Sequence, residues 1–217
     1  MKQTWLWVAI IVLLLIGAFV WWNSGANPTA PTMSTSTAVT TTTGDIIAGV
    51  PNATYTNSRL SFTITYPSTA TSSAFDFSGF LPRTQTPVVS FVLPSSMSQG
   101  TNLGEAGVYI GATTTPAAMR ACESPVSNGG ETSVGTTTIN GQEFASFTSS
   151  DAGAGNFYDS KIFRTYQNGA CFEIVELLHS GNIGNYPAGT VSEFDKSKFQ
   201  GILDAIVRTY ASVPTGI

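Results

Sequence analysis

The sequence FYDSKIFRTYQNGACFEIVELLH, residues 157–179, consists of two strand-like runs joined by the pair Asn168-Gly169. Asn-Gly is the preferred pair for a tight hairpin turn, because both residues tolerate a positive φ. A second pair, Asn140-Gly141, joins the strand-like residues 133–139 and 142–149 in the same way. Two successive hairpins predict an antiparallel sheet rather than a parallel one.

Three further runs predict additional strands of this sheet. Apolar and polar residues alternate over residues 60–66, and two β-rich runs cover residues 88–93 and 107–112. Alternation with a period of two is typical of a strand with one buried face. Between the predicted hairpins, the glycine-rich residues 152–156 are interpreted as a flexible connection.

Two helices are predicted as well. Thr115 and Pro116 supply an N-cap and a first helical residue for a short helix that ends near Cys122. Apolar residues recur at helical spacing from Phe199 to Tyr210, with Gln200, Asp204 and Arg208 on the opposite side. The predicted fold class is α+β, an antiparallel β-sheet covered by a long C-terminal helix and a short helix.

The only two cysteines, Cys122 and Cys171, are predicted to form a disulfide. Disulfides persist in oxidising compartments, and the sequence places this domain outside the cytoplasm, as argued next. A zinc site needs more ligands than the sequence offers around its single histidine, His179. The spacing Cys-x-x-Cys of redox pairs is absent from the sequence.

Residues 5–22, WLWVAIIVLLLIGAFVWW, contain no charged residue. A helix of that length reaches roughly 27 Å, enough to cross the hydrocarbon core of a bilayer. All four tryptophans lie at its two ends, where indole rings favour the headgroup layer. Lys2 precedes the run and no basic residue follows before Arg59, so the positive-inside rule places residues 1–4 in the cytoplasm. The sequence therefore predicts a single-pass signal anchor, with the lipid bilayer as partner and the C-terminal domain outside.

Cleavage of this segment is the alternative. Ser24-Gly25-Ala26 supplies small residues for a signal peptidase, and a cut near Ala26 would release a secreted domain. The apolar run is longer than the usual core of a signal peptide, and bulky Trp21 and Trp22 lie close to the cut. These features favour a retained anchor.

Residues 23–54 are predicted to form a stalk, with Ile46, Ile47 and Val50 as a first strand or lead-in against the domain. Nine of the twelve residues from Thr32 to Thr43 are Ser or Thr, a composition that buries too little apolar area to offset the entropy of ordering. Asn52-Ala53-Thr54 fits an N-glycosylation triplet, and the plain alternative is an unmodified tether. The folded extracytoplasmic domain is expected at residues 55–212, followed by a tail at 213–217.

Charge and motifs exclude several function classes. The net charge is −4 and the basic residues are scattered, so the sequence predicts no nucleic-acid partner. No nucleophile elbow, phosphate loop, zinc-protease motif or calcium loop is present. We therefore predict no catalytic, cofactor-binding or metal residues and no cofactor.

A few residues remain as candidates for chemistry. His179 shares a strand face with Glu173, but six residues separate them, about 20 Å along a strand, so they are not expected to touch. Asp151 and Asp159 flank the glycine-rich connection and leave open a carboxylate pair of the kind that glycoside hydrolases use. The aromatic residues Phe75, Phe77 and Phe80 are interpreted as core first and as a binding patch second.

Two segments carry a resemblance to PsbP-like domains. Residues 55–67, YTNSRLSFTITYP, resemble the first hairpin and Pro-terminated strand of that family, and residues 199–210, FQGILDAIVRTY, resemble its C-terminal helix. The family often has Trp after the Tyr-Pro step, where this chain has Ser68-Thr69. Over residues 55–212 the resemblance implies an α/β/α sandwich in non-enzymatic proteins that stabilise or bind larger assemblies.

The sequence thus predicts a membrane-anchored module of the cell envelope with a binding or structural role. Its expected partner outside the membrane is a protein or a glycan. The alternative is an envelope hydrolase that uses carboxylates on glycans or cell-wall material.

Overall fold

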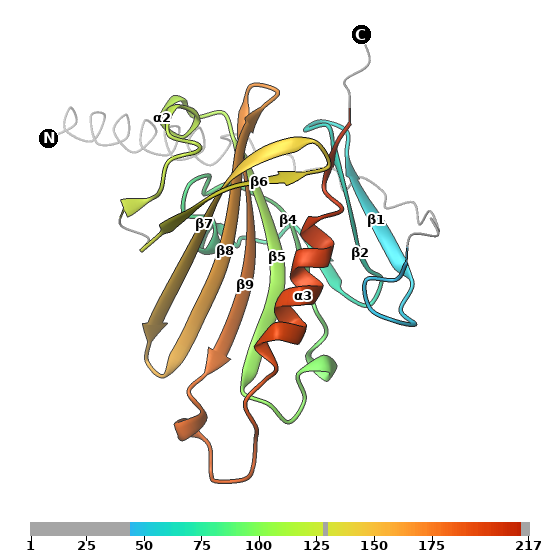
Figure 1. The fold of residues 1–217 in the computed structure, drawn as a ribbon, viewed down its shortest axis with the longest axis vertical. Helices are drawn as coiled ribbons and strands as arrows, with labels where there is room; N and C mark the ends of the chain where they lie inside the picture. The colour runs from blue at the N-terminus through green and yellow to red at the C-terminus, as the bar shows by residue number, and fades with distance from the viewer. Residues whose placement is uncertain (1–43, 128–129, 214–217) are drawn as a thin grey trace, which may run out of the picture. The chain divides into compact units, whose positions relative to one another are not determined.

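The structure is a computed structural model that describes residues 44–127 and 130–213 (Figure 1). The predicted anchor at residues 5–22 and most of the predicted stalk lie outside these residues. Among the helices of the described part, none combines the length and the apolar character needed to span a bilayer.

The described residues form an α+β fold dominated by antiparallel sheet, with few helices. A seven-stranded sheet has the order β3-β4-β5-β9-β8-β7-β6, and a three-stranded sheet has the order β1-β2-β10. The strands are β1 (Asn52–Asn57), β2 (Phe62–Pro67), β3 (Thr71–Ser73), β4 (Pro87–Val92), β5 (Leu103–Thr113), β6 (Thr132–Ile139), β7 (Gln142–Gly153), β8 (Asn156–Gln167), β9 (Ala170–Gly181) and β10 (Ala211–Ser212). The helices are α2 (Pro116–Arg120) and α3 (Lys196–Val207), with 3-10 turns η1 (Ser78–Phe80), η2 (Ser95–Met97) and η4 (Ile183–Asn185).

Both predicted hairpins are confirmed. Asn140 and Asn168 have φ of 45° and 50°, and the glycine after each also has a positive φ. The register pairs Ile139 with Gln142 in one hairpin and Gln167 with Ala170 in the other. These two turns fix which residues of β6, β7, β8 and β9 share a face.

The interpretation of residues 152–156 as a flexible connection is wrong. Ala154 and Gly155 form a third two-residue turn with φ of 49° and 79°, and β7 and β8 pair up to Gly153 and Asn156. Alanine rarely takes a positive φ, so this pair lacks the signal that identified the two Asn-Gly turns.

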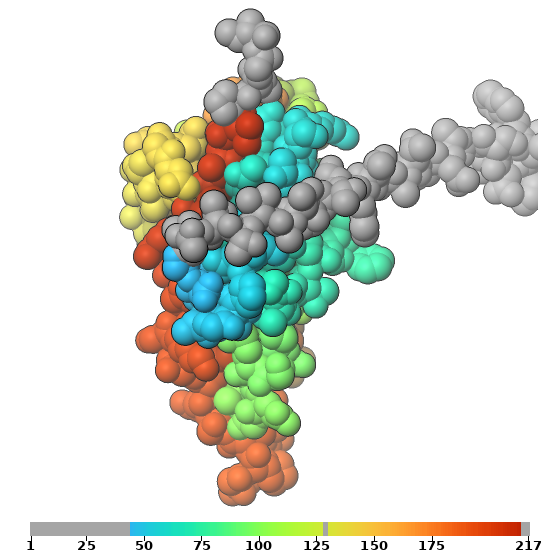
Figure 2. Space-filling model, turned by 90° about the vertical axis from the view of Figure 1, so that its right-hand side faces the viewer, coloured from blue at the N-terminus to red at the C-terminus, as the bar shows by residue number. Residues whose placement is uncertain are grey.

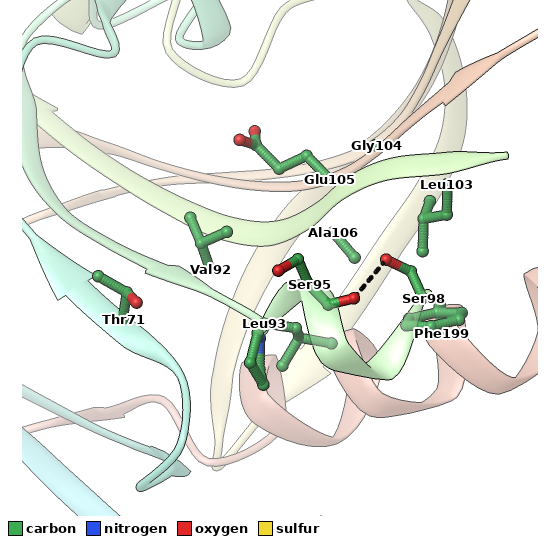
Figure 3. A pocket seen from close by; sticks show the side chains of 11 residues that line it. Thr71, Val92, Leu93, Ser95, Ser98, Leu103, Gly104, Glu105, Ala106 and Phe199 are labelled. Atoms are coloured by element: carbon green, nitrogen blue, oxygen red, sulfur yellow. Dashed lines mark hydrogen bonds between the residues drawn. The ribbon is translucent and has the colours of Figure 1, made fainter. Parts of the chain in front are cut away.

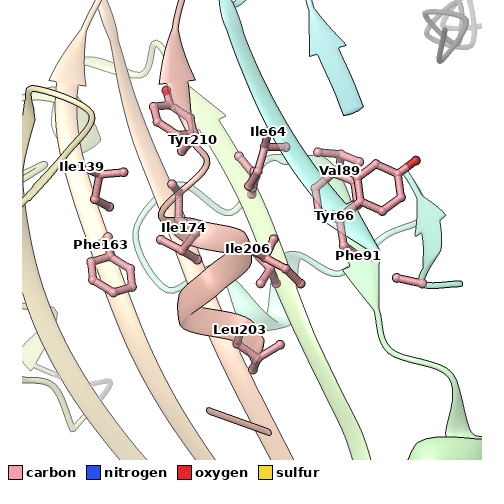
Figure 4. Close-up of a cluster of buried hydrophobic side chains, with 14 of the residues drawn as sticks. Ile64, Tyr66, Val89, Phe91, Ile139, Phe163, Ile174, Leu203, Ile206 and Tyr210 are labelled. Atoms are coloured by element: carbon pink, nitrogen blue, oxygen red, sulfur yellow. The ribbon is translucent and has the colours of Figure 1, made fainter. Parts of the chain in front are cut away.

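Alternation along β9 separates the two faces of the large sheet. Phe172, Ile174 and Leu178 belong to the larger hydrophobic cluster, which we call the first face, together with Leu203 and Ile206 of α3 (Figure 4). The three-stranded sheet closes this cluster, and β2 lies between β1 and β10, so that the N-terminal strands and the last described residues lie on the same side of the domain in Figure 2. Burial against α3 and β2 explains why the sheet needs apolar residues along this face.

The opposite face of the sheet, the second face, holds a smaller cluster. Val175 and Leu177 of β9 pack there against Tyr109 of β5, under Phe77 and Leu81 of the segment between β3 and β4. With both faces covered, every residue of β9 from Ala170 to Leu178 is buried. The pattern of β9 therefore reads as a nearly continuous apolar run.

The long C-terminal helix that the sequence predicts is not observed. Helix α3 has 12 residues and ends at Val207, so Tyr210 packs in the core from beyond the helix. The amide Nδ2 of Asn140 donates to the carbonyl oxygens of Arg208 and Tyr210, and the Thr65 amide donates to Thr209 Oγ1. These bonds turn the chain toward β2, where β10 pairs, and so end the helix.

The folded part also begins earlier than the expected boundary at residue 55. Strand β1 starts at Asn52, and Ile46 and Ile47 pack against the larger cluster. The Ile46 amide donates to Asn52 Oδ1 at 3.3 Å, which ties this lead-in to the strand. The lead-in expected at Ile46 and Ile47 is thus confirmed, and residues 46–54 contribute to the fold.

The predicted disulfide between Cys122 and Cys171 is confirmed. It joins the residues after α2 to the start of strand β9 on the second face, and both cysteines are buried. The two cysteines are 49 positions apart in the sequence, and the bond closes the loop between them.

Replacing both cysteines by alanine tests the contribution of this bond. A closed loop of this size stabilises by about 4 kcal/mol through the entropy of the unfolded chain. For a domain of this size, that loss lowers the melting temperature by roughly 8–16 °C. We expect calorimetry of the full chain to show this drop, and the wild type in reductant to show the same drop. A variant that melts within about 2 °C of the oxidised wild type would contradict the expectation.

Candidate functional site

The single histidine lies at the far end of β9 on the second face. Its Nε2 lies 3.0 Å from Asn156 Oδ1, and its ring stacks on Tyr158 at 4.5 Å between centroids with 8° between the planes. The ring edge carrying Nδ1 lies against Gly104, where an added Cβ would be 3.5 Å from it. These contacts hold the imidazole of His179 in one orientation on a half-buried surface.

Glu105 lies opposite His179 in the register between β5 and β9. Its carboxylate accepts a short hydrogen bond from the Tyr109 hydroxyl, which reaches it over Gly107. Burial and then the Glu105 carboxylate raise the pKa of Tyr109 above its ordinary value, so its hydroxyl stays protonated. The acid beside His179 is thus Glu105, which sequence reasoning missed because the two residues are far apart in the chain.

Glu173 shares the second face with His179 but binds other residues, in agreement with the expectation from their spacing that the two side chains do not touch. Its carboxylate accepts from Arg164 Nε at 2.7 Å, from the Thr84 amide at 2.8 Å and from the Thr84 hydroxyl at 3.0 Å. The amide of Arg83 donates to both of its oxygens. The Glu173 carboxylate therefore fixes the segment between β3 and β4 to the sheet.

Arg164 completes a buried ion triad with Glu173 and Glu131. All three side chains are shielded from solvent, and the guanidinium lies 4.9 Å from the centroid of the Phe147 ring. Burial opposes its charge, but the two carboxylates outweigh that effect and raise the pKa of Arg164 above its usual value. The Arg164 triad lies in the interior and links β8, β9 and the residue before β6.

Gly111 makes the close approach of this segment possible. A Cβ at this position would lie 2.2 Å from Thr84 Oγ1 and 2.7 Å from Leu81 Cδ1. The Thr86 carbonyl oxygen also accepts from the Ala112 amide at 3.1 Å. The glycine thus lets the segment lie directly on β5.

A second carboxylate cluster lies under α3 on the first face. Gln200 donates a short hydrogen bond to Glu176 Oε2, while Glu176 Oε1 is buried without a hydrogen-bond partner. Lys161 donates to Asp204 at 2.7 Å. Burial, and next the charge of Asp204, raise the pKa of Glu176 to about 9, so this acid is neutral at pH 7.

This cluster corrects the expected orientation of α3. The helical spacing placed Gln200 and Asp204 on the side away from the sheet, but both side chains meet groups of β8 or β9. The buried position of Glu176 carried a weak signal, because it lies between apolar residues in the run Ile174–Leu178.

Asp151 and Asp159 do not form a pair. Asp151 lies opposite Tyr158 on the second face. Asp159 follows Tyr158 and therefore lies on the first face, where its carboxylate accepts from Lys196 Nζ at 2.6 Å and from the Ser150 hydroxyl at 2.7 Å. Although partial burial opposes it, bonding to Lys196 and Ser150 lowers the pKa of Asp159. Within residues 44–127 and 130–213, no three His, Cys, Asp or Glu side chains are grouped to hold a metal ion.

A cavity of about 390 Å³ lies where β4 ends and β5 begins (Figure 3). Leu93, Leu103 and Phe199 contribute apolar surface, and Ser95 and Ser98 contribute hydroxyl groups. Glu105 is also part of the lining, but its carboxylate points away from the η2 turn in Figure 3. The cavity therefore brings no two acids together.

The aromatic residues between β3 and β4 divide into core and surface. Phe77 is buried, and Phe77 and Phe80 both pack on the Tyr109 ring, with centroids 5.4 Å and 5.0 Å away. Phe75 is 84% exposed and stands apart from them. The interpretation as core is confirmed for Phe77 and Phe80, while Phe75 alone lies on the surface.

Comparisons with known proteins give a resemblance of fold only. No protein family matches the sequence, and no curated protein matches it. The solution structure of cyanobacterial PsbP (CyanoP) from Synechocystis sp. PCC 6803 aligns over 79% of this chain and 98% of its own, with 11% identity and a TM-score of 0.44. A crystal structure from Bacteroides thetaiotaomicron aligns over 76% of this chain at 14% identity and a TM-score of 0.44, and this chain spans about half, 49%, of that protein. The weak fold-level resemblance to PsbP expected from the sequence is confirmed, and it carries no function to this chain.

Glu176→Gln tests the neutral acid under α3. The pKa of Glu176 is about 9 in the folded chain and about 4.3 in an unfolded chain. Between these values the folded chain holds the extra proton, so stability is fullest below about pH 4 and falls as the pH rises toward 9. We expect urea unfolding of the full chain to show a decline of up to about 1.4 kcal/mol per pH unit, which Glu176→Gln removes.

The exposed Glu143→Gln on β7 is the matched control for this measurement and should leave the decline unchanged. Equal pH dependence in the wild type and Glu176→Gln would show that Glu176 is charged beneath the helix.

Proposed function

We propose that this chain is a membrane-anchored, extracytoplasmic binding module of the cell envelope. In this proposal residues 5–22 form a single-pass signal anchor and the described domain lies outside the cytoplasm. The domain is a PsbP-like α/β/α sandwich, in which α2 and the segment between β3 and β4 form the layer opposite α3.

The disulfide between Cys122 and Cys171 is the observation that carries the location. Disulfides rarely persist in the reducing cytoplasm, and this one follows an apolar run flanked by tryptophans. The two features support the same orientation independently, because one depends on redox conditions and the other on lipid.

The placement of the acids favours binding over hydrolysis. An envelope hydrolase that acts through carboxylates needs two acids that face one substrate. Glu131 and Glu173 instead bind Arg164 in the interior, and Glu176 and Asp204 meet under α3. These four acids serve the fold. Glu105 and Asp151 share the second face, but three strand spacings separate them, roughly 14 Å, which exceeds the separation of about 5–9.5 Å between the two acids of a glycoside hydrolase. This placement supports a role in recognition for the domain.

Protease accessibility in intact cells tests the orientation. With an epitope tag after Ile217, we expect external protease to remove the tag from the full chain while a cytoplasmic marker survives. Non-reducing electrophoresis should show a faster band that disappears in the variant with both cysteines replaced by alanine. A tag that is cut only after lysis, or free thiols in cells, would overturn the proposed location.

A further inference from the structure

Four side chains from four neighbouring strands stand in one line across the second face. The register pairs Asp151 of β7 with Tyr158 of β8, Tyr158 with His179 of β9, and His179 with Glu105 of β5. Side chains that lie directly opposite on adjacent strands share one face of the sheet. We call these four residues the His179 row.

The His179 row is held in place before any ligand arrives. Tyr158 and His179 stack with nearly parallel rings, Asn156 fixes the imidazole, and the Tyr109 hydroxyl fixes Glu105. Such prior ordering lowers the entropy lost when a ligand binds. The row therefore has the rigidity of a recognition surface.

The row is open to solvent and is extended by one further ring. Tyr158, His179 and Glu105 are half-buried, and Asp151 is exposed. Tyr186 is 38% exposed and lies over Gly181, where an added Cβ would be 2.6 Å from its hydroxyl oxygen. Gly181 follows His179 by two residues on the same face of β9, so the Tyr186 ring adjoins the row.

The polar groups of the row select the charge of the ligand. Asp151 and Glu105 are acidic, whereas Lys161 and Lys196 bind acids that lie on the first face. An anionic ligand is therefore disfavoured. A ligand with hydroxyl donors and apolar C–H faces would use both the carboxylate oxygens and the aromatic rings.

We propose that the His179 row, together with Asn156 and Tyr186, is a binding surface for a neutral saccharide chain. This inference rests on the proposed binding function and names its ligand class. Three strand spacings of about 4.8 Å make the row roughly 14 Å long, which suits a short run of linked hexose rings rather than one small molecule.

Titration calorimetry of the full chain in lipid nanodiscs tests this surface. Nanodiscs avoid detergents with sugar headgroups, which would compete. The probes are chitotetraose and cellotetraose, two neutral β-linked chains that differ in their N-acetyl groups. We expect at least one of them to bind, and Tyr186→Ala and Asn156→Ala to weaken that binding about fivefold to tenfold, because each removes one stacking or orienting contact.

Tyr166→Ala is the matched control. Tyr166 is also an exposed tyrosine, at 52%, but it lies at the opposite end of β8 beside Glu123. We expect it to bind the probe as the wild type does. All three variants should melt at the wild-type temperature, which separates lost contacts from lost folding.

The outcomes separate this inference from the proposed function. If neither tetrasaccharide binds, or if Tyr166→Ala weakens binding as much as Tyr186→Ala, the saccharide surface is overturned, whatever the location of the domain. Cleavage of a bound probe, seen by mass spectrometry, would support the surface but overturn a purely binding function. A domain located in the cytoplasm would overturn the proposed function without affecting the titration.

Discussion

Burial of β9 on both faces is the constraint on which the structure depends. The strand lies between β5 and β8 in the large sheet, under α3 on one side and the segment between β3 and β4 on the other. It nevertheless carries Glu173 and Glu176. A buried carboxylate needs either a cation or a proton. Glu173 has the guanidinium of Arg164, and Glu176 keeps its proton.

These two solutions also organise the surroundings of the strand. The Glu173 carboxylate binds the Arg83 and Thr84 amides, so the covering segment is attached by charge as well as by apolar packing. The Glu176 side chain meets α3 through Gln200. One acid therefore fixes each covering layer, and the two layers are attached by different chemistry.

The sequence predicted the parts of the fold that local patterns encode. Asn140-Gly141 and Asn168-Gly169 identified two hairpins, and the cysteine pair identified the disulfide. Contacts between distant residues left no such pattern. Glu131 and Arg164 are 33 residues apart, and Glu105 meets His179 only through the register of β5 with β9. The end of α3 was missed because Asn140, on a distant turn, caps it.

The candidate surface could be located only in part. His179 stood out as the single histidine, but the partners considered for it were those on its own strand. Its neighbours come from β5 and β8, whose alignment depends on the bulge between Leu103 and Glu105 and on the Ala154-Gly155 turn. The disulfide lies at the opposite end of β9, so one end of that strand is covalently fixed while the other carries the His179 row.

The central position of β9 also sets the order in which backbone amides meet solvent. Amides at sheet edges exchange through small local openings, whereas those of a doubly covered central strand exchange only when the whole domain opens. Deuterium should thus enter the edge strands β1 and β6 early and β9 last. Among the described residues, the slowest amides report the global stability of the domain, and they belong to the strand that carries the buried acids Glu173 and Glu176.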